Sequence, residues 1–247
     1  MKARYIDAHC HLHEFGNDEI RKMLEEIDVI IVAVSDDLES SRRTLSLYRE
    51  YPDRIKPCLG LHPWSVGEVE APLQQAREIV KMAEHEGVDC IGEVGLDTKF
   101  VPQTIEKQRE VFRVFLEYAS DTGSFMNLHT AGTWEEVLKL VREAGVRRAN
   151  FHWYTGPQHL LDSIREAGYT ISINPAVRIQ RKHQEIVKKA PLDMILVESD
   201  GPYEYRGLRL TPLLIPETLE IIAGLKNVSV DEVLERVRAN AARVLGL

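Results

Sequence analysis

Short apolar runs alternate with amphipathic stretches from one end of the chain to the other. The apolar runs are rich in β-branched residues and lie at 5–9, 28–35, 55–61, 89–95, 125–129, 148–152, 169–174 and 193–199. Runs of this length predict buried strands. Their separation by helical stretches indicates parallel strands that are joined by crossover connections.

The amphipathic stretches predict the connecting helices. Between 104 and 123, Val111, Phe112, Phe115 and Leu116 recur at helical spacing, and Gly123 follows as a stop signal. The segments 135–145 and 159–168 also end on a glycine, and two more helices are expected at about 213–223 and 230–244.

The number of strand–helix units indicates the fold. Eight such units in 247 residues predict an α/β protein with a (β/α)8 TIM-type barrel and an extra C-terminal helix. No linker-like tract or internal repeat interrupts the pattern, so residues 1–247 are expected to form a single domain. A doubly wound sheet is the alternative, but it normally carries a glycine-rich fingerprint where this chain reads HCHLHEFG.

Composition and charge limit the expected cellular location of the protein and the kinds of partner it can bind. The chain has no apolar run long enough to span a bilayer and no signal-peptide pattern. Its cysteines, Cys10, Cys58 and Cys90, are scattered without a CxxC pair, which predicts free thiols in a cytoplasmic protein. The net charge of −8 argues against non-specific coating of nucleic acid but allows a local cationic site for a phosphate. No feature indicates a membrane or protein partner.

The segment YIDAHCHLHEFG carries three of the nine histidines of the chain at alternating positions, namely His9, His11 and His13. Alternate residues of a strand face the same side, so Asp7, His9 and His11 are expected to converge. Imidazole is the commonest metal-binding side chain near neutral pH, and this pair therefore predicts part of a metal site.

Groups that can bind metal recur at the carboxyl ends of six predicted strands. They are His9, His11, His62, Glu93, His129, His152 and Asp200. In a barrel these ends form one face, and barrel enzymes build their active sites there. By contrast, His85, His159 and His183 fall on predicted helices and are interpreted as structural.

Nitrogen and oxygen ligands in this number exceed what one tetrahedral ion needs. Four of the five histidines with the two carboxylates make six ligands, which fit two divalent ions with one carboxylate bridging. Two such ions acidify water and neutralise both the attacking and the leaving oxygen of a displacement. The ligand types therefore predict metal-assisted hydrolysis.

These motifs resemble the TatD family of metal-dependent deoxyribonucleases, within the amidohydrolase-like metallo-dependent hydrolases. The matching stretches are DAHCHLH (7–13), GLHPW (60–64), IGEVGLD (91–97), QREVFRVFLEYA (108–119), FHWYTG (151–156), LVESDGPY (196–203), RGLR (206–209) and NAARVLGL (240–247). They occur in the family's order over nearly the whole chain.

The resemblance implies a dinuclear metal centre and a nuclease activity. Its ligands would be His9, His11, Glu93, His129, His152 and Asp200, holding two divalent ions such as Mg²⁺, Mn²⁺ or Zn²⁺. Glu93 would bridge the ions, Asp200 would also accept the proton of the attacking water, and Asp7 would support the ligands from behind. The implied reaction is hydrolysis of phosphodiester bonds at DNA ends or in a smaller phosphoester.

Three positions depart from the family pattern. The chain has His13 where the family usually has aspartate, Ala131 where it usually has arginine, and Leu210 in place of an asparagine. These changes affect substrate contacts and leave the ligands intact. They leave open an alternative activity on a carboxylic ester, lactone, amide or aminoacyl ester at the same metal site. A second alternative, a metal-bearing binding module, is disfavoured because such a module needs no open site.

Substrate contacts are predicted from residues close to the ligands. His62 could position a phosphate or protonate a leaving group, or it could cap the loop before Pro63. The basic residues predicted to reach a phosphate are Arg178, Arg181, Lys182, Arg206 and Arg209. A solvated helix face is the competing interpretation for Arg178 and the favoured one for Lys188 and Lys189. Trp64, Trp153 and Tyr154 could stack on a base or pack in the core.

Overall fold

All eight predicted strands are present in the computed structural model, which describes residues 5–247. They are β1 (Tyr5–Cys10), β2 (Val29–Ala33), β3 (Ile55–Pro57), β4 (Cys90–Gly95), β5 (Phe125–His129), β6 (Arg148–Phe151), β7 (Thr170–Ile173) and β8 (Ile195–Val197). Several strands are shorter than predicted because the apolar run continues past the last paired residue into the loop. A small hairpin of β9 (Glu204–Tyr205) and β10 (Leu208–Arg209) was not predicted.

Helices follow the strands in alternation. They are α1 (Asn17–Glu26), α2 (Leu38–Glu50), α3 (Pro72–Glu86), α4 (Ile105–Thr122), α5 (Trp134–Glu143), α6 (Leu160–Glu166), α7 (Arg181–Lys189), α8 (Ile215–Lys226) and α9 (Val230–Leu245). The predicted stop at Gly123 is confirmed, since this residue ends α4 with φ of 71°, a conformation that glycine adopts without strain. Within residues 5–247, no helix is long and apolar enough to cross a membrane.

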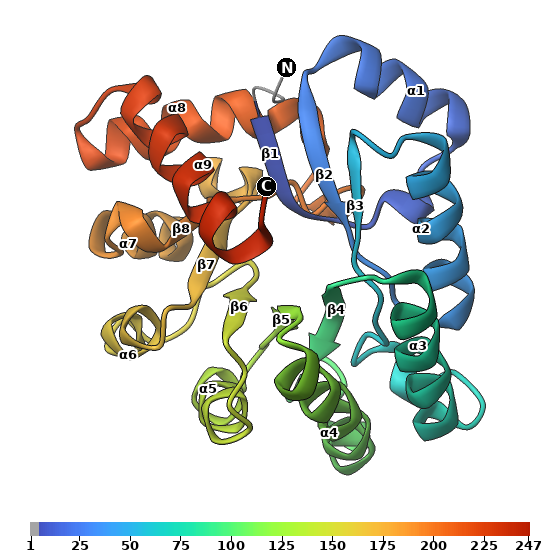
Figure 1. Cartoon of the computed structure of the whole chain (residues 1–247). Coiled ribbons are helices and arrows are strands. Elements are labelled where there is room, and N and C mark those ends of the chain that lie inside the picture. The colour runs from blue at the N-terminus through green and yellow to red at the C-terminus, as the bar shows by residue number, and fades with distance from the viewer. Residues whose placement is uncertain (1–4) are drawn as a thin grey trace.

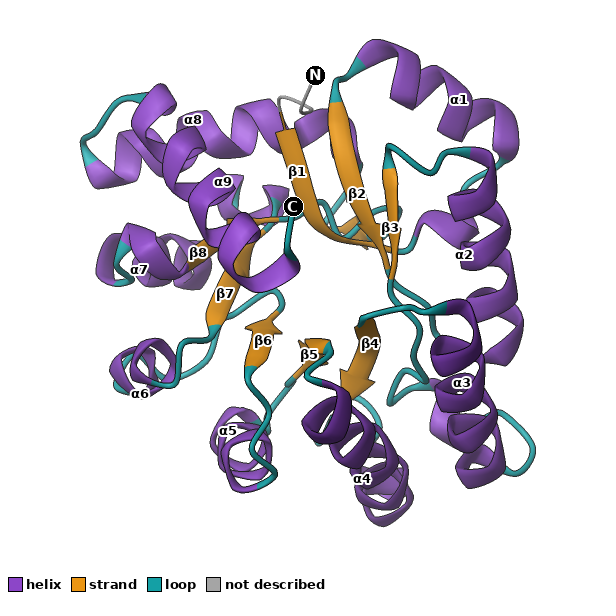
Figure 2. Ribbon diagram, viewed as in Figure 1, coloured by secondary structure: helices purple, strands orange, loops and turns teal. Residues whose placement is uncertain are grey.

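The strands follow one another in order around a barrel, with helices outside (Figures 1 and 2). Strands β1, β2 and β3 pair in parallel, and so do β4 to β8. A bridge between Leu59 and Ile91 joins the β3 and β4 segments. The other junction is closed near the strand ends, where the Asp200 amide donates to the His9 carbonyl at 2.9 Å. The predicted (β/α)8 barrel is confirmed.

The extra C-terminal helix, α9, packs at the end of the barrel where strands begin. The Asn240 side-chain amide donates to the carbonyls of Leu192 and Ile195 at 2.8 and 2.9 Å, just before and at the start of β8. The Arg148 guanidinium, at the start of β6, donates to the Val244 carbonyl at 3.3 Å. This helix therefore leaves the opposite end, where the strands finish, free to form a site.

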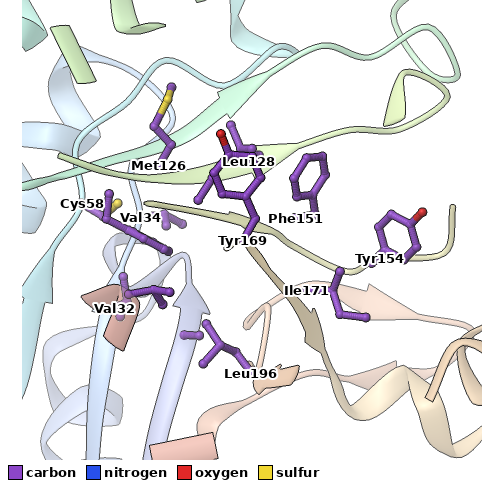
Figure 3. Packing of buried hydrophobic residues seen from close by; sticks show 14 of the residues in the cluster. Val32, Val34, Cys58, Met126, Leu128, Phe151, Tyr154, Tyr169, Ile171 and Leu196 are labelled. Atoms are coloured by element: carbon purple, nitrogen blue, oxygen red, sulfur yellow. The ribbon is translucent and has the colours of Figure 1, made fainter. Parts of the chain in front are cut away.

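The barrel strands are held by a continuous apolar core. Figure 3 shows Val32, Leu128, Phe151, Ile171 and Leu196, which come from five different strands and are fully buried. Burying one side chain of this size contributes about 1.5–3 kcal/mol. The summed burial gives the strand ends a rigid support.

The prediction of three free thiols is wrong. Cys58 and Cys90 form a disulfide, and only Cys10 is a free, buried thiol among the described residues. The two half-cystines are 32 positions apart in the chain, but their Cα atoms lie 4.5 Å apart because the β3 and β4 segments are neighbours. Sequence spacing cannot reveal a pair that is brought together by strand order.

Removing this disulfide should destabilise the fold. The double variant Cys58→Ala, Cys90→Ala is expected to lose about 2–4 kcal/mol of unfolding free energy, since the cross-link restricts the unfolded chain. Urea unfolding followed by circular dichroism measures the change. The Cys10→Ala variant is the matched control for removing a buried sulfur. A double variant no less stable than the control would show that the cross-link contributes nothing.

Candidate metal centre

The carboxyl ends of the strands surround a pocket of about 240 Å³. Its wall includes five of the six implied ligands, namely His11, Glu93, His129, His152 and Asp200. The sixth, His9, is fully buried and lies 3.1 Å from the Glu93 carboxylate. The structure thus brings together residues that span nearly 200 positions of the sequence.

Glu93 occupies the centre of this cluster and is almost completely buried. Its Oε2 atom lies 3.1 Å from His9 Nε2 and 3.2 Å from His11 Nε2. Its Oε1 atom lies 2.7 Å from His129 Nδ1 and 2.8 Å from His152 Nε2. Burial opposes ionisation, but the surrounding imidazoles, His152 first, hold the pKa of Glu93 well below its usual value. Each oxygen of an ionised carboxylate therefore faces a different pair of histidines.

The first donor set consists of His9, His11, Glu93 and Asp200. Its nitrogen and oxygen atoms are 3.1 to 3.5 Å apart wherever their separation is measured, including the two His Nε2 atoms at 3.3 Å. Ligands held by one ion at bond lengths of about 2.1 Å lie about 3.0–3.4 Å from each other. Glu93 Oε2 is buried without a hydrogen-bond partner, as expected for an atom that faces a cation.

The protonation of His9 supports this interpretation. Asn127 donates its side-chain amide to the Ala8 carbonyl at 2.7 Å, which leaves Asn127 Oδ1 as an acceptor. This oxygen lies 3.0 Å from His9 Nδ1, so Nδ1 carries the proton. The unprotonated Nε2 then points at carboxylates and another imidazole, an arrangement that favours a metal ion between them.

The second donor set consists of His129, His152 and the other oxygen of Glu93. His129 Nε2 lies 2.9 Å from Asp97 Oδ2, which leaves Nδ1 to face Glu93. Although burial opposes it, hydrogen bonding from His129 and other donors lowers the pKa of Asp97 to about 2. Gly95 allows this close arrangement, because a Cβ atom there would lie 2.0 Å from the His129 carbonyl oxygen.

A carboxylate or amide oxygen faces the second ring nitrogen of every histidine in the two sets. Asn127 serves His9 and Asp97 serves His129, while Asp36 Oδ1 lies 3.1 Å from His11 Nδ1 and Glu198 Oε1 lies 3.7 Å from His152 Nδ1. Hydrogen bonds such as those at His9 and His129 orient metal-binding imidazoles and set their tautomers. These four residues were not predicted from the sequence. Asp36 and Asp97 come one and two positions after predicted strands, which is the signal that could have found them.

Asp7 and Asp200 connect the first and last strands. The Asp7 carboxylate accepts hydrogen bonds from the backbone amides of Ser199 and His9 at 2.7 and 3.2 Å. Burial raises its pKa to about 8. Asp200 has a left-handed backbone with φ of 55°, a strained conformation of the kind found at functional sites. Asp7 thus holds the backbone that presents Asp200 to the pocket.

His62 differs from the four histidines of the donor sets. Its Nδ1 accepts a hydrogen bond from the Trp64 backbone amide at 3.1 Å, so in the neutral ring Nε2 carries the proton. Burial lowers the pKa of His62, which favours this neutral form. Nε2 lies 3.2 Å from Glu93 Oε1 and faces the pocket as a donor. The ring is better suited to donate a hydrogen bond than to bind metal.

The five basic residues predicted to reach a phosphate, Arg181 and Lys182 among them, do not line this pocket. Arg178 lies 3.3 Å from Glu217, Arg209 lies 2.8 Å from Glu19, and Arg206 stacks over Tyr205. Among the described residues that line the pocket, Lys99 is the one lysine or arginine. Contact of the arginines with substrate stays a prediction.

Aromatic side chains form much of the pocket wall. Trp64 and Trp153 line it, whereas Tyr154 is fully buried and donates its hydroxyl to the Pro157 carbonyl at 2.7 Å. The remaining aromatic rings on the wall were not predicted and are Phe100, Trp134, Tyr203 and Tyr205. Ala131, at the position of the family's arginine, also lies on the wall and leaves it without a charge there.

A barrel whose strand ends present histidines around a buried carboxylate defines a class of protein, the metal-dependent hydrolases. The chain matches the family model for TatD related DNase over residues 6–246. It therefore belongs to the TatD family of metal-dependent hydrolases. The family resemblance drawn from the motifs is thus confirmed over residues 6–246.

Individual relatives agree with this assignment. The chain is 28% identical to the uncharacterized metal-dependent hydrolase MJ1582 of Methanocaldococcus jannaschii, over 98% of this chain and 96% of that protein. It is also 28% identical to the deoxyribonuclease TATDN3 of Homo sapiens, over 97% and 93% of the two chains. The crystal structure of YjjV, a TatD homologue from Escherichia coli, has the same fold, with a TM-score of 0.88, 22% identity and full coverage of both chains.

Proposed function

We propose that this protein is a two-metal phosphodiesterase that hydrolyses DNA at its ends or a smaller nucleotide ester. The observation that carries the proposal is the Glu93 carboxylate, whose two oxygens face separate donor sets 2.7 to 3.2 Å away. The names of the relatives add support, since the human protein is called a deoxyribonuclease.

The bound ions would lower the pKa of water and neutralise charge that develops on the phosphoryl oxygens. Asp200, together with the other residues of the first donor set, would hold one ion, and its carboxylate would accept the proton of the attacking water. Glu93 would contribute one carboxylate oxygen to each donor set. The neutral His62 donates from Nε2 to a phosphoryl oxygen or to the leaving oxygen.

The pocket wall offers surfaces for a nucleobase. Trp64, Phe100 and Tyr203 are 36%, 55% and 42% exposed, so their ring faces are available for stacking. Trp64 is oriented by donating its indole N–H to Asp97 at 2.6 Å, and Asp97 also holds His129. Asp97 therefore positions both an aromatic ring of the pocket wall and a histidine of the second donor set.

The runner-up is hydrolysis of a neutral carboxylic ester, lactone, amide or aminoacyl ester at the same centre. It is favoured by the uncharged Ala131 and by the absence of Arg178, Arg206 and Arg209 from the described pocket wall. A neutral substrate would need fewer cations than a phosphodiester does.

The ligand types indicate which metal ions suit the centre, and the cysteines bear on the location of the protein in the cell. A set of imidazoles and carboxylates suits Zn²⁺ and Mn²⁺, while Mg²⁺ prefers oxygen ligands. Cytoplasmic location stays a prediction, and the disulfide between Cys58 and Cys90 removes one of its original supports.

A hydrolysis screen tests the proposal. Purified protein with Mg²⁺, Mn²⁺, Zn²⁺ or Co²⁺ should cleave single-stranded DNA and bis-p-nitrophenyl phosphate, and a chelator should abolish this cleavage. The Glu93→Ala variant, prepared in the same way, is the control against contaminating nucleases. Robust hydrolysis of p-nitrophenyl acetate without cleavage of either phosphodiester would replace the nuclease with the runner-up.

A further inference from the structure

A second group of metal-binding side chains lies beside the dinuclear centre. It consists of His13, Glu14 and Asp36, together with the outward-facing Nδ1 of His11. One ligand atom from each of these four residues lies within 4.8 Å of the others. His13 is the residue that the motif comparison placed where the family usually has aspartate.

In this group two hydrogen-bond acceptors face each other with no donor between them. His13 Nδ1 lies 3.2 Å from the Val34 carbonyl, an acceptor, so Nδ1 carries the proton of the neutral ring. The unprotonated Nε2 then faces Asp36 Oδ2, also an acceptor, at 3.1 Å. The other oxygen, Asp36 Oδ1, is buried and lies 3.1 Å from His11 Nδ1. Two acceptors this close need either a second proton on His13 or a cation between them.

We infer that His13, Glu14 and Asp36 hold a third divalent cation on the wall of the pocket. The 3.1 Å between His13 Nε2 and Asp36 Oδ2 matches two ligands of one ion, which lie about 3.0–3.4 Å apart at bond lengths of about 2.1 Å. A neutral imidazole with two carboxylates balances the charge of one divalent ion. Nitrogen and oxygen donors in this mixture suit Zn²⁺ or Mn²⁺.

Asp36 links this site to the dinuclear centre. Its Oδ1 lies 3.1 Å from His11 Nδ1, while His11 Nε2 belongs to the first donor set. His11 Nδ1 keeps its proton when Nε2 binds metal, so His11 orients the Asp36 carboxylate and is not a ligand of the third ion. The ligands are then one nitrogen and two carboxylates, which leaves coordination positions open.

The open positions face the pocket, since Glu14 and Asp36 are part of its wall. An ion there would add positive charge to the pocket wall. Among the described residues of this wall, Lys99 is the one lysine or arginine. Such an ion would hold a phosphate next to the scissile one. This role in substrate binding rests on the proposed phosphodiesterase activity, whereas the cation site does not.

Counting bound ions without substrate tests the site. Wild-type protein is dialysed to equilibrium against Mn²⁺ or Zn²⁺, and bound metal is measured by inductively coupled plasma mass spectrometry. The His13→Ala and Glu14→Gln variants should each bind one ion per chain fewer than the wild type. Glu14 is exposed, so its variant keeps the fold even if His13→Ala does not.

The His159→Ala variant is the matched control. His159 lies 3.1 Å from the Glu135 carboxylate on the surface, without further ligands in its cluster, and its loss should leave the metal count unchanged. Equal metal counts in wild type, His13→Ala and Glu14→Gln would overturn the third site and assign His13 and Asp36 to an ion pair. That result leaves the dinuclear centre intact, which a count of at least two ions in all three proteins would demonstrate.

Discussion

Replacing Asp200 with asparagine is expected to lower kcat on a DNA oligomer by about 10²–10⁴-fold, the usual contribution of a positioned general base. Asparagine has nearly the same shape and keeps an oxygen that can bind metal, but it cannot accept the proton of the attacking water. KM should change little, because substrate binds mainly through the ions and the aromatic wall. Steady-state kinetics with Mn²⁺ measures both quantities.

The matched control is Asp193→Asn, which makes the same chemical change at an exposed residue paired with Arg165. Its kcat should equal that of the wild type. Metal content must be measured on Asp200→Asn as well, so that a lost ion is not mistaken for a lost base. A variant that keeps its metals and loses as much in KM as in kcat would show that Asp200 only helps to hold substrate.

Replacing Glu93 with alanine is expected to release both ions of the dinuclear centre. Each oxygen of this carboxylate faces one donor set, so a single substitution removes a ligand from both. After dialysis that strips weakly held metal, the wild type should retain two ions per chain and Glu93→Ala fewer than one. His9→Ala and His129→Ala each remove one imidazole from one set and should lose mainly one ion.

Glu110→Ala, at an exposed position of α4, controls for the loss of a carboxylate. Circular dichroism should show that Glu93→Ala retains its secondary structure, since the barrel core does not depend on this side chain. If Glu93→Ala keeps one tightly bound ion, the two donor sets bind metal independently and the carboxylate is not a bridge. A wild type that retains one ion or none would reject the dinuclear centre itself.

The structure also changes which residues are worth testing for substrate contact. Arg178 and Arg209 form ion pairs with Glu217 and Glu19 outside the pocket. Trp64 and Phe100 lie on the pocket wall with exposed rings. Aromatic contacts and Lys99 are therefore the first candidates for recognition of the substrate beyond the scissile group.

The alternation of apolar runs and helices was enough to predict the barrel, because parallel strands buried on both faces leave a continuous apolar signal. The grouping of the candidate ligands was predictable for a related reason. In a barrel all strands end on one face, so His9, Glu93, His129, His152 and Asp200 could be assigned to one site from their places after predicted strands.

The local sequence pattern does not specify which distant segments lie close together. The tertiary structure decides this. Because the β3 and β4 segments are neighbours, Cys58 pairs with Cys90. Asp36 faces both His11 and His13. Arg178 and Arg209 pair with glutamates outside the pocket. Each of these outcomes depends on side-chain direction and on which strands are neighbours. The sequence by itself thus determined the barrel and the grouping of the candidate metal ligands at one end of it. Only packing in three dimensions determined which residues support these ligands and which line the pocket around them.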